Sequence, residues 1–205
     1  MHSLPLMISQ IDAAWMIALH SVTNPALDWA AWLLSTIGWM GACFWVLAAV
    51  LWVRGYRLLA TQVVIALVLG AIAAEVLKHG FHRVRPSELM PQFVHLPLPS
   101  LHDSRWSFPS GHATLAMAAA MAVVFSTHKR WAWLLVLGAL LIGWARIYQG
   151  MHWPSDVVAG WIIGIIAGLA AVIVSILFEN NSLFLKEKNG YASCSRRTTT
   201  SLSDI

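Results

Sequence analysis

Long apolar stretches separated by short polar segments form the main pattern of this sequence. The longest, Trp29–Val53, contains twenty-five residues and no charge. Four more come after it, at Leu58–Leu77, Phe108–Thr127, Trp131–Ile147 and Val157–Phe178. A helix of about 20 apolar residues is long enough to cross the hydrocarbon core of a bilayer. The pattern therefore predicts about five transmembrane helices.

Residues 5–22 are also apolar, but they include Gln10, Asp12 and His20 and are short for a span. We interpret them as an amphipathic helix that lies in the membrane interface, with a sixth span as the alternative. Asn24-Pro25 then marks a turn into the first span.

The composition agrees with a membrane protein. Of the 205 residues, 59% are hydrophobic and 11% are charged, whereas roughly 25% of the residues of a soluble domain are charged. The formal charge of +4 is scattered in small groups, so we expect no nucleic-acid partner. Cys43 and Cys194 lie in an apolar stretch and in the polar tail, and they predict no disulfide framework. The predicted fold class is an all-α polytopic membrane helix bundle.

The last span and the C-terminal segment have two distinctive features. Gly160, Gly164 and Gly168 recur every four residues, which places them on one helix face where a second helix could approach closely; the alternative is that glycine is simply common in spans. Residues 179–205 are polar and rich in Ser and Thr. We expect a membrane domain over 1–178 and a disordered cytoplasmic tail over 179–205.

The distribution of lysine and arginine predicts the orientation. Arg54 and Arg57 come after the first span, Lys129 and Arg130 after the third, and more basic residues after the fifth. With five spans, all of these lie on one side, which should be the cytoplasm. The other side nevertheless carries five cations: Lys78, Arg83, Arg85, Arg105 and Arg146. This excess of positive charge on the outer side calls for a functional explanation.

Lys78 and Arg85-Pro86 lie just after the second span. Seven residues are close to two helical turns, so both cations would share a face if the helix continued to Arg85. Pro86 disfavours helix at Arg85 and should help to end it there. Lysine as a point charge and arginine as a bidentate donor suit a phosphate group. The alternative is a pair of basic side chains that reach the membrane interface.

Pro109-Ser110-Gly111-His112 opens the third span. Ser110 is a favourable N-cap, and Gly111 would let an anion approach the free backbone N–H groups of the helix start. His112 would point to the same anion. A capped helix with an incidental histidine explains this group equally well.

Arg146, His152 and Asp156 surround the turn between the fourth and fifth spans. Asp156 falls in the first turn of the last helix, from which its carboxylate could hold one ring nitrogen of His152. The other nitrogen would then be free to act as a nucleophile or a base. Asp156 as a simple helix N-terminal charge is the alternative. Together, the three groups describe phosphoryl transfer at one membrane face.

On these residues the sequence resembles the type 2 phosphatidic acid phosphatase superfamily of membrane lipid phosphatases. Its tripartite signature is matched by Lys78 with Arg85-Pro86, by Pro109–His112, and by Arg146 with His152 and Asp156. The family usually has Ser directly before the third-motif arginine, where this chain has Ala145. Vanadium haloperoxidases share the signature, but they are soluble, and five spans argue against that chemistry.

The resemblance implies roles for these residues. His152 would attack phosphorus to form a phosphohistidine, Asp156 would orient His152, and His112 would protonate the leaving oxygen. The phosphoryl oxygens would be held by Lys78, Arg85, Ser110, Gly111 and Arg146, with Arg105 as an additional candidate from its position. The resemblance implies no metal and no cofactor. We therefore interpret His79, His82, His95 and His102 as solvated or packing residues.

The resemblance further implies a bacterial inner-membrane phosphatase whose site opens to the outer side. Undecaprenyl diphosphate is the favoured substrate, because it presents its diphosphate on that side. Phosphatidylglycerophosphate, phosphatidic acid and transfer of phosphate to a lipid acceptor are alternatives. A non-catalytic lipid-binding or transport module is an alternative of a different class. Met90–Leu101, apolar and rich in proline, would shape the lipid entrance or rest on the interface.

Overall fold

The computed structural model describes residues 3–21, 24–94, 96–97 and 106–200, and within them every regular element is a helix. The α-helices are α1 (Ser3–His20), α2 (Pro25–Ile37), α3 (Ala42–Val53), α4 (Arg57–Phe81), α5 (Pro86–Leu89), α6 (Gly111–Thr127), α7 (Trp133–Tyr148) and α8 (Pro154–Thr200). The 3₁₀ turns η1 (Trp39–Gly41), η2 (Pro91–Phe93) and η3 (Arg130–Ala132) lie between them. The all-α bundle predicted from the sequence is confirmed.

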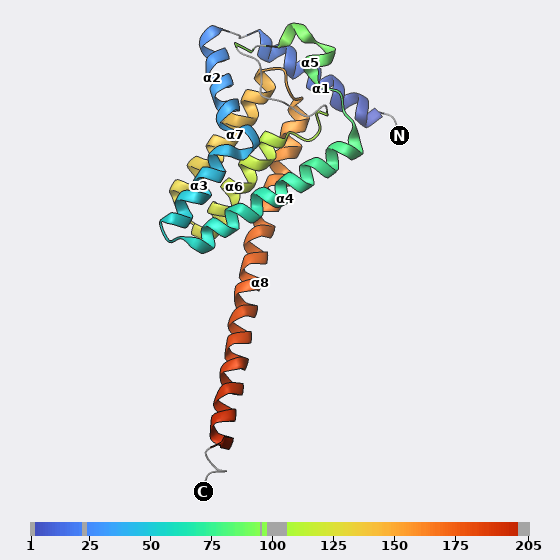
Figure 1. The fold of residues 1–205 in the computed structure, drawn as a ribbon. Coiled ribbons are helices and arrows are strands. Elements are labelled where there is room, and N and C mark those ends of the chain that lie inside the picture. Colours follow the sequence, from blue (N-terminus) through green and yellow to red (C-terminus); the bar gives the residue numbers. More distant parts are fainter. Residues whose placement is uncertain (1–2, 22–23, 95, 98–105, 201–205) are drawn as a thin grey trace.

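Helix α6 forms the centre of the bundle (Figure 1). Every residue from His112 to Val124 is buried, and many of them are alanines. Small side chains let α4, α7 and α8 pack against α6 on several sides. The N-terminus of this central helix is therefore enclosed by the surrounding helices.

The glycine face predicted on the last span is the contact between α8 and α6. A Cβ atom at Gly160 would lie 2.8 Å from the Ser110 carbonyl oxygen. At Gly164 it would lie 2.6 Å from the Thr114 carbonyl oxygen, and Gly168 makes an equally close approach one turn further on. No real Cβ tolerates such distances from a backbone atom, so the glycines bring the two helix starts together.

The first predicted span is not one continuous helix. Helices α2 and α3 are separated by Gly38 and η1 and are bent by 49° relative to each other. Gly41 adopts a left-handed conformation (φ 71°), which glycine reaches without steric cost. The apolar pattern of Trp29–Val53 predicts that this segment lies in the membrane, but it does not predict the bend.

Much of the exposed surface of the bundle is apolar, as expected for contact with lipid. Three helical segments are long and apolar enough to cross a membrane, and the bent α2–α3 pair makes a fourth candidate. Helix α6 is apolar but has only 17 residues. Large apolar side chains such as Val46, Val53, Leu134 and Ile166 are more than half exposed, an arrangement that water disfavours over so wide an area. The chain is a multi-pass membrane protein, and the count of five spans stays a prediction.

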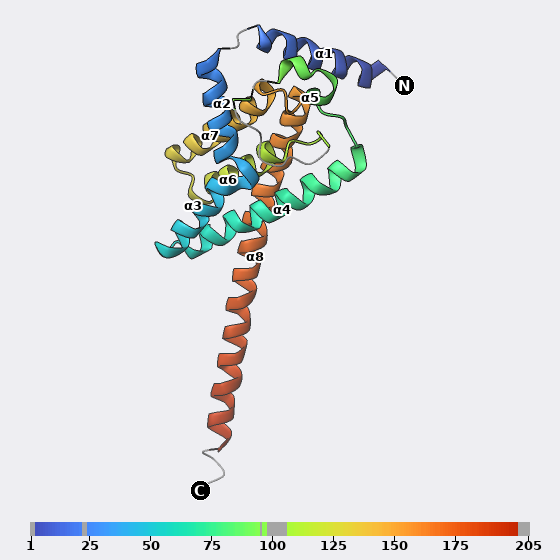
Figure 2. The ribbon, with the colours of Figure 1, turned by 45° about the horizontal axis from the view of Figure 1, so that its top comes forward.

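Helix α1 lies across the end of the bundle where α8 begins (Figures 1 and 2). It contacts α7 and α8. Ile11, Trp15 and Ile17 are exposed on its outer side, whereas Asp12 and Met16 are buried. This arrangement fits the predicted interfacial helix, whose apolar outer side would meet the bilayer.

Helix α8 differs from the sequence prediction at its C-terminal end. The sequence predicts a disordered tail from residue 179, whereas α8 continues as a helix to Thr200, well beyond the other helices (Figure 1). Residues 179–200 contain no proline and a single glycine, so the segment has few residues that would break a helix. The division into two domains at residue 179 stays a prediction.

Candidate active site

The predicted site residues meet at one end of the bundle, where α6 and α8 begin and α7 ends. The backbone N–H of Ser110, just before α6, donates to the Asp156 carbonyl oxygen in α8 at 3.0 Å. The three sequence groups are thus brought together from positions 78–85, 110–112 and 146–156. Arg105, the additional candidate, lies outside the described residues.

His152 is fully buried, with an exposed fraction of 1%. Its Nδ1 lies 2.8 Å from the Ser107 carbonyl oxygen. Because a carbonyl only accepts hydrogen bonds, this contact places the proton on Nδ1 and leaves a lone pair on Nε2. Nε2 faces the Arg85 guanidinium, with Nη1 at 3.3 Å. A phosphate oxygen bound by Arg85 would therefore lie beside an unprotonated ring nitrogen.

Asp156 does not hold His152 in the way the sequence predicts. Its Oδ2 is 3.9 Å from His152 Nδ1, which is too far for a hydrogen bond. Oδ2 instead accepts from the Ser107 hydroxyl and from the Trp153 N–H at 3.0 Å. The carboxylate therefore acts on His152 through its charge and through Ser107, whose carbonyl makes the direct contact.

Lys78 lies within helix α4, whereas Arg85 lies in the extended segment after that helix. Helix α4 ends at Phe81, with His82 in the left-handed conformation (φ 47°), so the two cations do not share a helix face. Arg85 is extended before Pro86, as the proline predicts. Its guanidinium donates to the carbonyl oxygens of Met151 (2.8 Å) and Trp106 (3.2 Å), which fixes it beside His152.

Lys78 lies over the start of α6. A Cβ atom built on Gly111 would be 3.6 Å from Lys78 Nζ, so the missing side chain leaves the lysine close to the helix N-terminus. Lys78 is also 3.5 Å from Glu75 Oε2, one turn earlier on α4. Ser110 is the N-cap of α6 and accepts from the Ala113 N–H, so its predicted capping role is confirmed.

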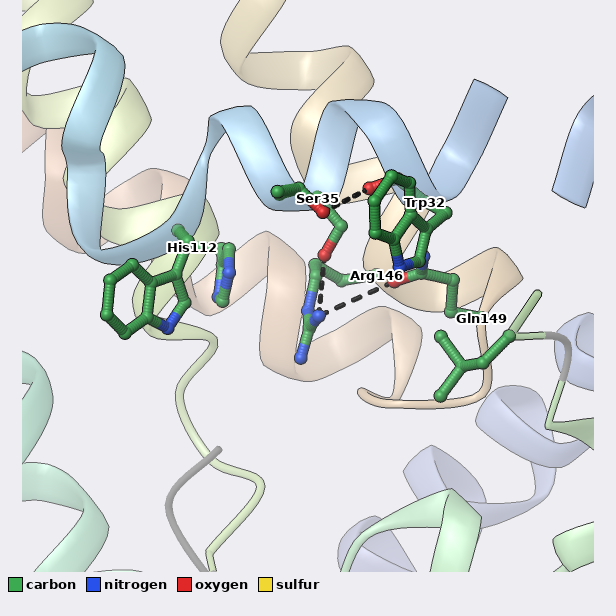
Figure 3. A pocket seen from close by; sticks show the side chains of 8 residues that line it. Trp32, Ser35, His112, Arg146 and Gln149 are labelled. Atoms are coloured by element: carbon green, nitrogen blue, oxygen red, sulfur yellow. Dashed lines mark hydrogen bonds between the residues drawn. The ribbon is translucent and has the colours of Figure 1, made fainter. Parts of the chain in front are cut away.

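His112 and Arg146 line one pocket beside the bent α2–α3 segment, together with Trp32, Ser35, Thr36, Trp39, Leu96 and Gln149. Figure 3 shows the Arg146 guanidinium between Ser35 and Gln149. Its Nη1 donates to Ser35 Oγ at 2.7 Å and to Gln149 Oε1 at 3.4 Å. The pocket thus joins the predicted acid, His112, to a buried guanidinium.

The part of the site around His112 is positive. The charges of Arg146, Arg85 and Lys78 all act on the His112 ring. Arg146 and Arg85 are 2% and 5% exposed. Buried cations so close together repel one another, and a bound anion would offset that repulsion. The arrangement therefore favours the binding of a group with several negatively charged oxygens, such as a phosphate.

Four residues at the site were missed by the sequence analysis: Asp12, Arg83, Ser107 and Gln149. Arg83 was counted only among the outer cations and Asp12 only as an interruption of an apolar segment. In the structure Arg83 donates to both Asp12 and Asp156, with each contact at 2.5 Å. Nothing in the local pattern predicts contacts between residues 71 and 73 positions apart.

Gln149 was missed although it lies inside the third group. It is 1% exposed, and its Nε2 is a buried donor without a hydrogen-bond partner in the part of the chain that the structure describes. An unsatisfied buried donor costs free energy, so such a group is often one that a ligand satisfies. The polar character of Gln149 at the end of an apolar span was the available signal.

His79 and His82 contact residues other than the predicted site residues. His79 Nδ1 contacts the Glu75 carbonyl oxygen at 2.8 Å, and the His82 ring packs edge-on against Trp106. His95 and His102 lie outside the described residues. Among the residues that are described, no group of three or more His, Cys, Asp or Glu is placed to hold a metal ion.

The comparison with known families agrees with this geometry. The sequence profile of the PAP2 superfamily matches residues 59–180, more than half of the chain and all three residue groups of the site. The chain belongs to the PAP2 superfamily. The resemblance seen in the sequence is thereby confirmed.

Curated PAP2 relatives include named lipid phosphatases. The chain is 32% identical over 168 residues to the putative undecaprenyl-diphosphatase YbjG of Escherichia coli, covering 77% of this chain and 81% of the relative. It is 34% identical over 110 residues to an undecaprenyl-diphosphatase of Sulfolobus acidocaldarius, covering 53% of this chain and 51% of that relative. The match therefore spans only about half the length of the second protein.

Solved PAP2 structures share the fold. The crystal structure of Aquifex aeolicus LpxE superposes with a TM-score of 0.66 at 29% identity, covering 78% of this chain and 93% of that one. A PAP2-type phosphatidylglycerolphosphate phosphatase from Bacillus subtilis gives the same TM-score at 22% identity, covering 88% and 89%. The second likeness concerns the fold alone.

Proposed function

We propose that this protein hydrolyses a lipid phosphate or diphosphate without a metal, through a phosphohistidine formed on His152. The proposal rests on the position of the proton on the His152 ring and on the group that faces its other nitrogen. The Ser107 carbonyl fixes the proton on Nδ1, and Nε2 faces the Arg85 guanidinium in a buried, positive site. A nucleophile and a phosphate-binding group therefore lie side by side.

In the first step, the Nε2 lone pair attacks phosphorus and the bond from phosphorus to the leaving oxygen breaks. His112, whose protonated form is favoured by the negative charge of the bound phosphate, gives that oxygen a proton. The charge that develops on the phosphoryl oxygens is stabilised by Lys78, Arg85 and Arg146 and by the backbone amides at the start of α6, including Gly111. The Ser110 side chain is used as the helix cap, so its contribution to the site is to hold those amides in place.

In the second step, water attacks the phosphohistidine and the N–P bond breaks. His112, now unprotonated, accepts the proton of the water, and phosphate leaves. Asp156, whose charge lies 3.9 Å from Nδ1, favours the positive imidazole formed during attack. One histidine thus serves as acid and then as base, and no co-reactant other than water is needed.

Undecaprenyl diphosphate is the substrate we favour. Relatives from three sources carry the name undecaprenyl-diphosphatase, among them BcrC of Bacillus subtilis, which is 39% identical over 83 residues. Other relatives are named lipid A 1-phosphatase and phosphatidylglycerophosphatase B, so these lipids are the alternatives. All of them offer a phosphate group on a lipid, which the positive buried site would bind.

The proposed location is a bacterial inner membrane, with the site on the outer side and the C-terminus in the cytoplasm. The lysine and arginine distribution supports this orientation, since Arg54, Arg57, Lys129 and Arg130 all lie at the opposite ends of the helices from His152. Labelling of single cysteines introduced at residues 95 and 190, in a background without Cys43 and Cys194, tests it. Residue 95 should react from outside and residue 190 only after permeabilisation; the reverse pattern contradicts the orientation.

Phosphate release by the purified protein in detergent with EDTA tests the proposed activity. Undecaprenyl diphosphate, phosphatidylglycerophosphate and phosphatidic acid would be compared, with His152→Ala alongside. We expect turnover in the wild type that EDTA leaves unchanged and that the variant loses. Release of phosphate from none of the lipids by folded protein would favour a non-catalytic lipid-binding role.

A further inference from the structure

We propose that Asp12, on the N-terminal helix α1, is a positioning residue of the active site and acts through Arg83 and Ser155 on Asp156. The proposal rests on the proposed function, because it concerns how the catalytic Asp156 and His152 are held. It assigns a role in the reaction to a helix that lies outside the matched family region, residues 59–180.

The first observation is the burial of a charge on α1, on the same side of the helix as the buried Met16. Asp12 is 2% exposed, whereas Ile11, Trp15 and Ile17 of the same helix are each more than half exposed. Burial of a carboxylate is costly unless it is paired and hydrogen-bonded. Docking of α1 by apolar contacts alone would place an apolar residue at this position.

The second observation is that both oxygens of the Asp12 carboxylate accept hydrogen bonds from residues that adjoin Asp156. Oδ1 accepts from the Ser155 N–H at 2.9 Å, and Oδ2 accepts from the Ser155 hydroxyl at 2.6 Å. Oδ2 also accepts from Arg83 Nη2 at 2.5 Å. Asp12 thus binds the first turn of α8, where a negative charge is favoured by the helix N-terminus.

The third observation is that a single guanidinium joins the two carboxylates. Arg83 Nη1 donates to Asp156 Oδ1 at 2.5 Å and to Ser155 Oγ at 2.7 Å, while Nη2 binds Asp12. The planar, rigid guanidinium fixes the separation and the orientation of its partners. Its face also lies over the Trp153 ring, 5.4 Å from the centroid.

From Asp156 the contacts continue to the nucleophile. Asp156 Oδ2 accepts from the Ser107 hydroxyl, and the Ser107 carbonyl accepts from His152 Nδ1. Removal of the Asp12 charge would leave Arg83 bound to Asp156 and Ser155, without the second carboxylate that draws it away from Asp156. The carboxylate, Ser107 and the His152 ring would then shift together, and a shift of about 1 Å in a catalytic group can cost up to about 100-fold in rate.

A merely structural role for Asp12 predicts a different result. If Asp12 only attaches α1 to the bundle, its loss lowers thermal stability and leaves the turnover of the folded fraction unchanged. If Asp12 positions the site, kcat falls while KM, which reflects lipid binding at Lys78, Arg85 and Arg146, stays nearly constant. The variants Asp12→Asn and Arg83→Gln separate these cases, with Gln10→Ala, an exposed position on the same helix, as the matched control.

The experiment measures kcat, KM and melting temperature of the full-length protein in detergent, on the lipid that the wild type hydrolyses fastest. We expect Asp12→Asn to lower kcat between about tenfold and 100-fold with KM nearly unchanged, and Gln10→Ala to match the wild type. The double variant should lose less activity than the product of the two single losses, because both residues share the Arg83 guanidinium. Unchanged kcat in folded Asp12→Asn, or simple multiplication of the two losses, would overturn the proposal.

Ser155→Ala serves if Asp12→Asn fails to fold, because it removes the hydroxyl between Asp12 and Arg83 but keeps the backbone hydrogen bond to Asp12. A folded Ser155→Ala with wild-type kcat would count against the proposal. An inactive wild type contradicts the proposed function instead. The positioning role of Asp12 is then tested by NMR of the His152 ring, which needs no turnover. The proton resonance of His152 Nδ1 should move in Asp12→Asn and not in Gln10→Ala; identical resonances in both would overturn it.

Discussion

The ring nitrogen Nδ1 of His152 lies 2.8 Å from the carbonyl oxygen of Ser107, whereas Oδ2 of Asp156 lies 3.9 Å from the same nitrogen. The backbone therefore fixes the tautomer of His152, and the carboxylate contributes a negative charge nearby. The Ser107 hydroxyl joins the two, because it donates to Asp156. The tautomer and the charge are thus supplied by different groups, which can be changed separately.

Asp156→Asn should keep the proton on Nδ1 and slow the reaction. The Ser107 carbonyl still accepts from Nδ1, but the positive imidazole formed during attack loses its neighbouring negative charge. We expect kcat to fall by about 10²-fold or more, on the scale of a lost electrostatic contribution. Nitrogen NMR of the labelled ring reports the tautomer. Loss of the Nδ1 proton in the variant would show that the carboxylate, and not Ser107, sets it.

His112→Ala should lose more activity on a lipid substrate than on an activated one. A general acid contributes about 10²–10⁴-fold when the leaving oxygen needs a proton. A nitrophenyl phosphate leaves without protonation, so the first step should be nearly unaffected with that compound. The ratio of the two losses in the first turnover, before water attacks the phosphohistidine, is the measurement, with the exposed His79→Ala as control. Equal losses on both substrates would contradict the role of His112 as the acid.

Gln149→Leu should weaken substrate binding. The variant keeps the size of the side chain but removes the buried donor, which has no hydrogen-bond partner among the described residues. A phosphate oxygen in the pocket with His112 and Arg146 would accept from it. We expect KM or the inhibition constant of inorganic phosphate to rise about tenfold to 100-fold, as for one hydrogen bond to a charged group. Gain of stability without any change in either constant would show that Gln149 does not reach the substrate.

Gly164→Ala should destabilise the bundle. The new Cβ would lie 2.6 Å from the Thr114 carbonyl oxygen, so α8 and α6 would have to separate. Overpacking of this kind costs about 1–3 kcal/mol. Gly138→Ala on α7 is the matched control, since a Cβ there meets nothing within 4 Å. Thermal unfolding in detergent compares the two, and equal melting temperatures would contradict the close packing of α6 and α8.

The sequence predicted the parts of this molecule that depend on local pattern. The apolar stretches gave the helices, Ser110 was identified as a cap, and the spacing of Gly160, Gly164 and Gly168 gave the face that α6 contacts. The three site groups were assigned to one membrane face because each lies next to the end of a span. In each case the signal lies within a few neighbouring residues.

The features that the sequence did not predict depend on distant contacts. The bend between α2 and α3 falls in an uninterrupted apolar stretch, where hydrophobicity alone does not distinguish one helix from two. Asp12 and Arg83 are 71 positions apart, and no periodicity connects them. Asp156 was expected to reach His152 because both lie near one turn, but the Ser107 carbonyl, from another segment, occupies that place.

The central claim is that His152 becomes covalently phosphorylated, and trapping that intermediate tests it most directly. Wild-type protein would be mixed with lipid diphosphate labelled on its terminal phosphate, in the presence of EDTA, and quenched within the first turnover. We predict label on the protein that survives alkali and is lost in acid, as expected for an N–P bond, and that is absent in His152→Ala. Label that persists in His152→Ala, or turnover by that variant, would contradict the account.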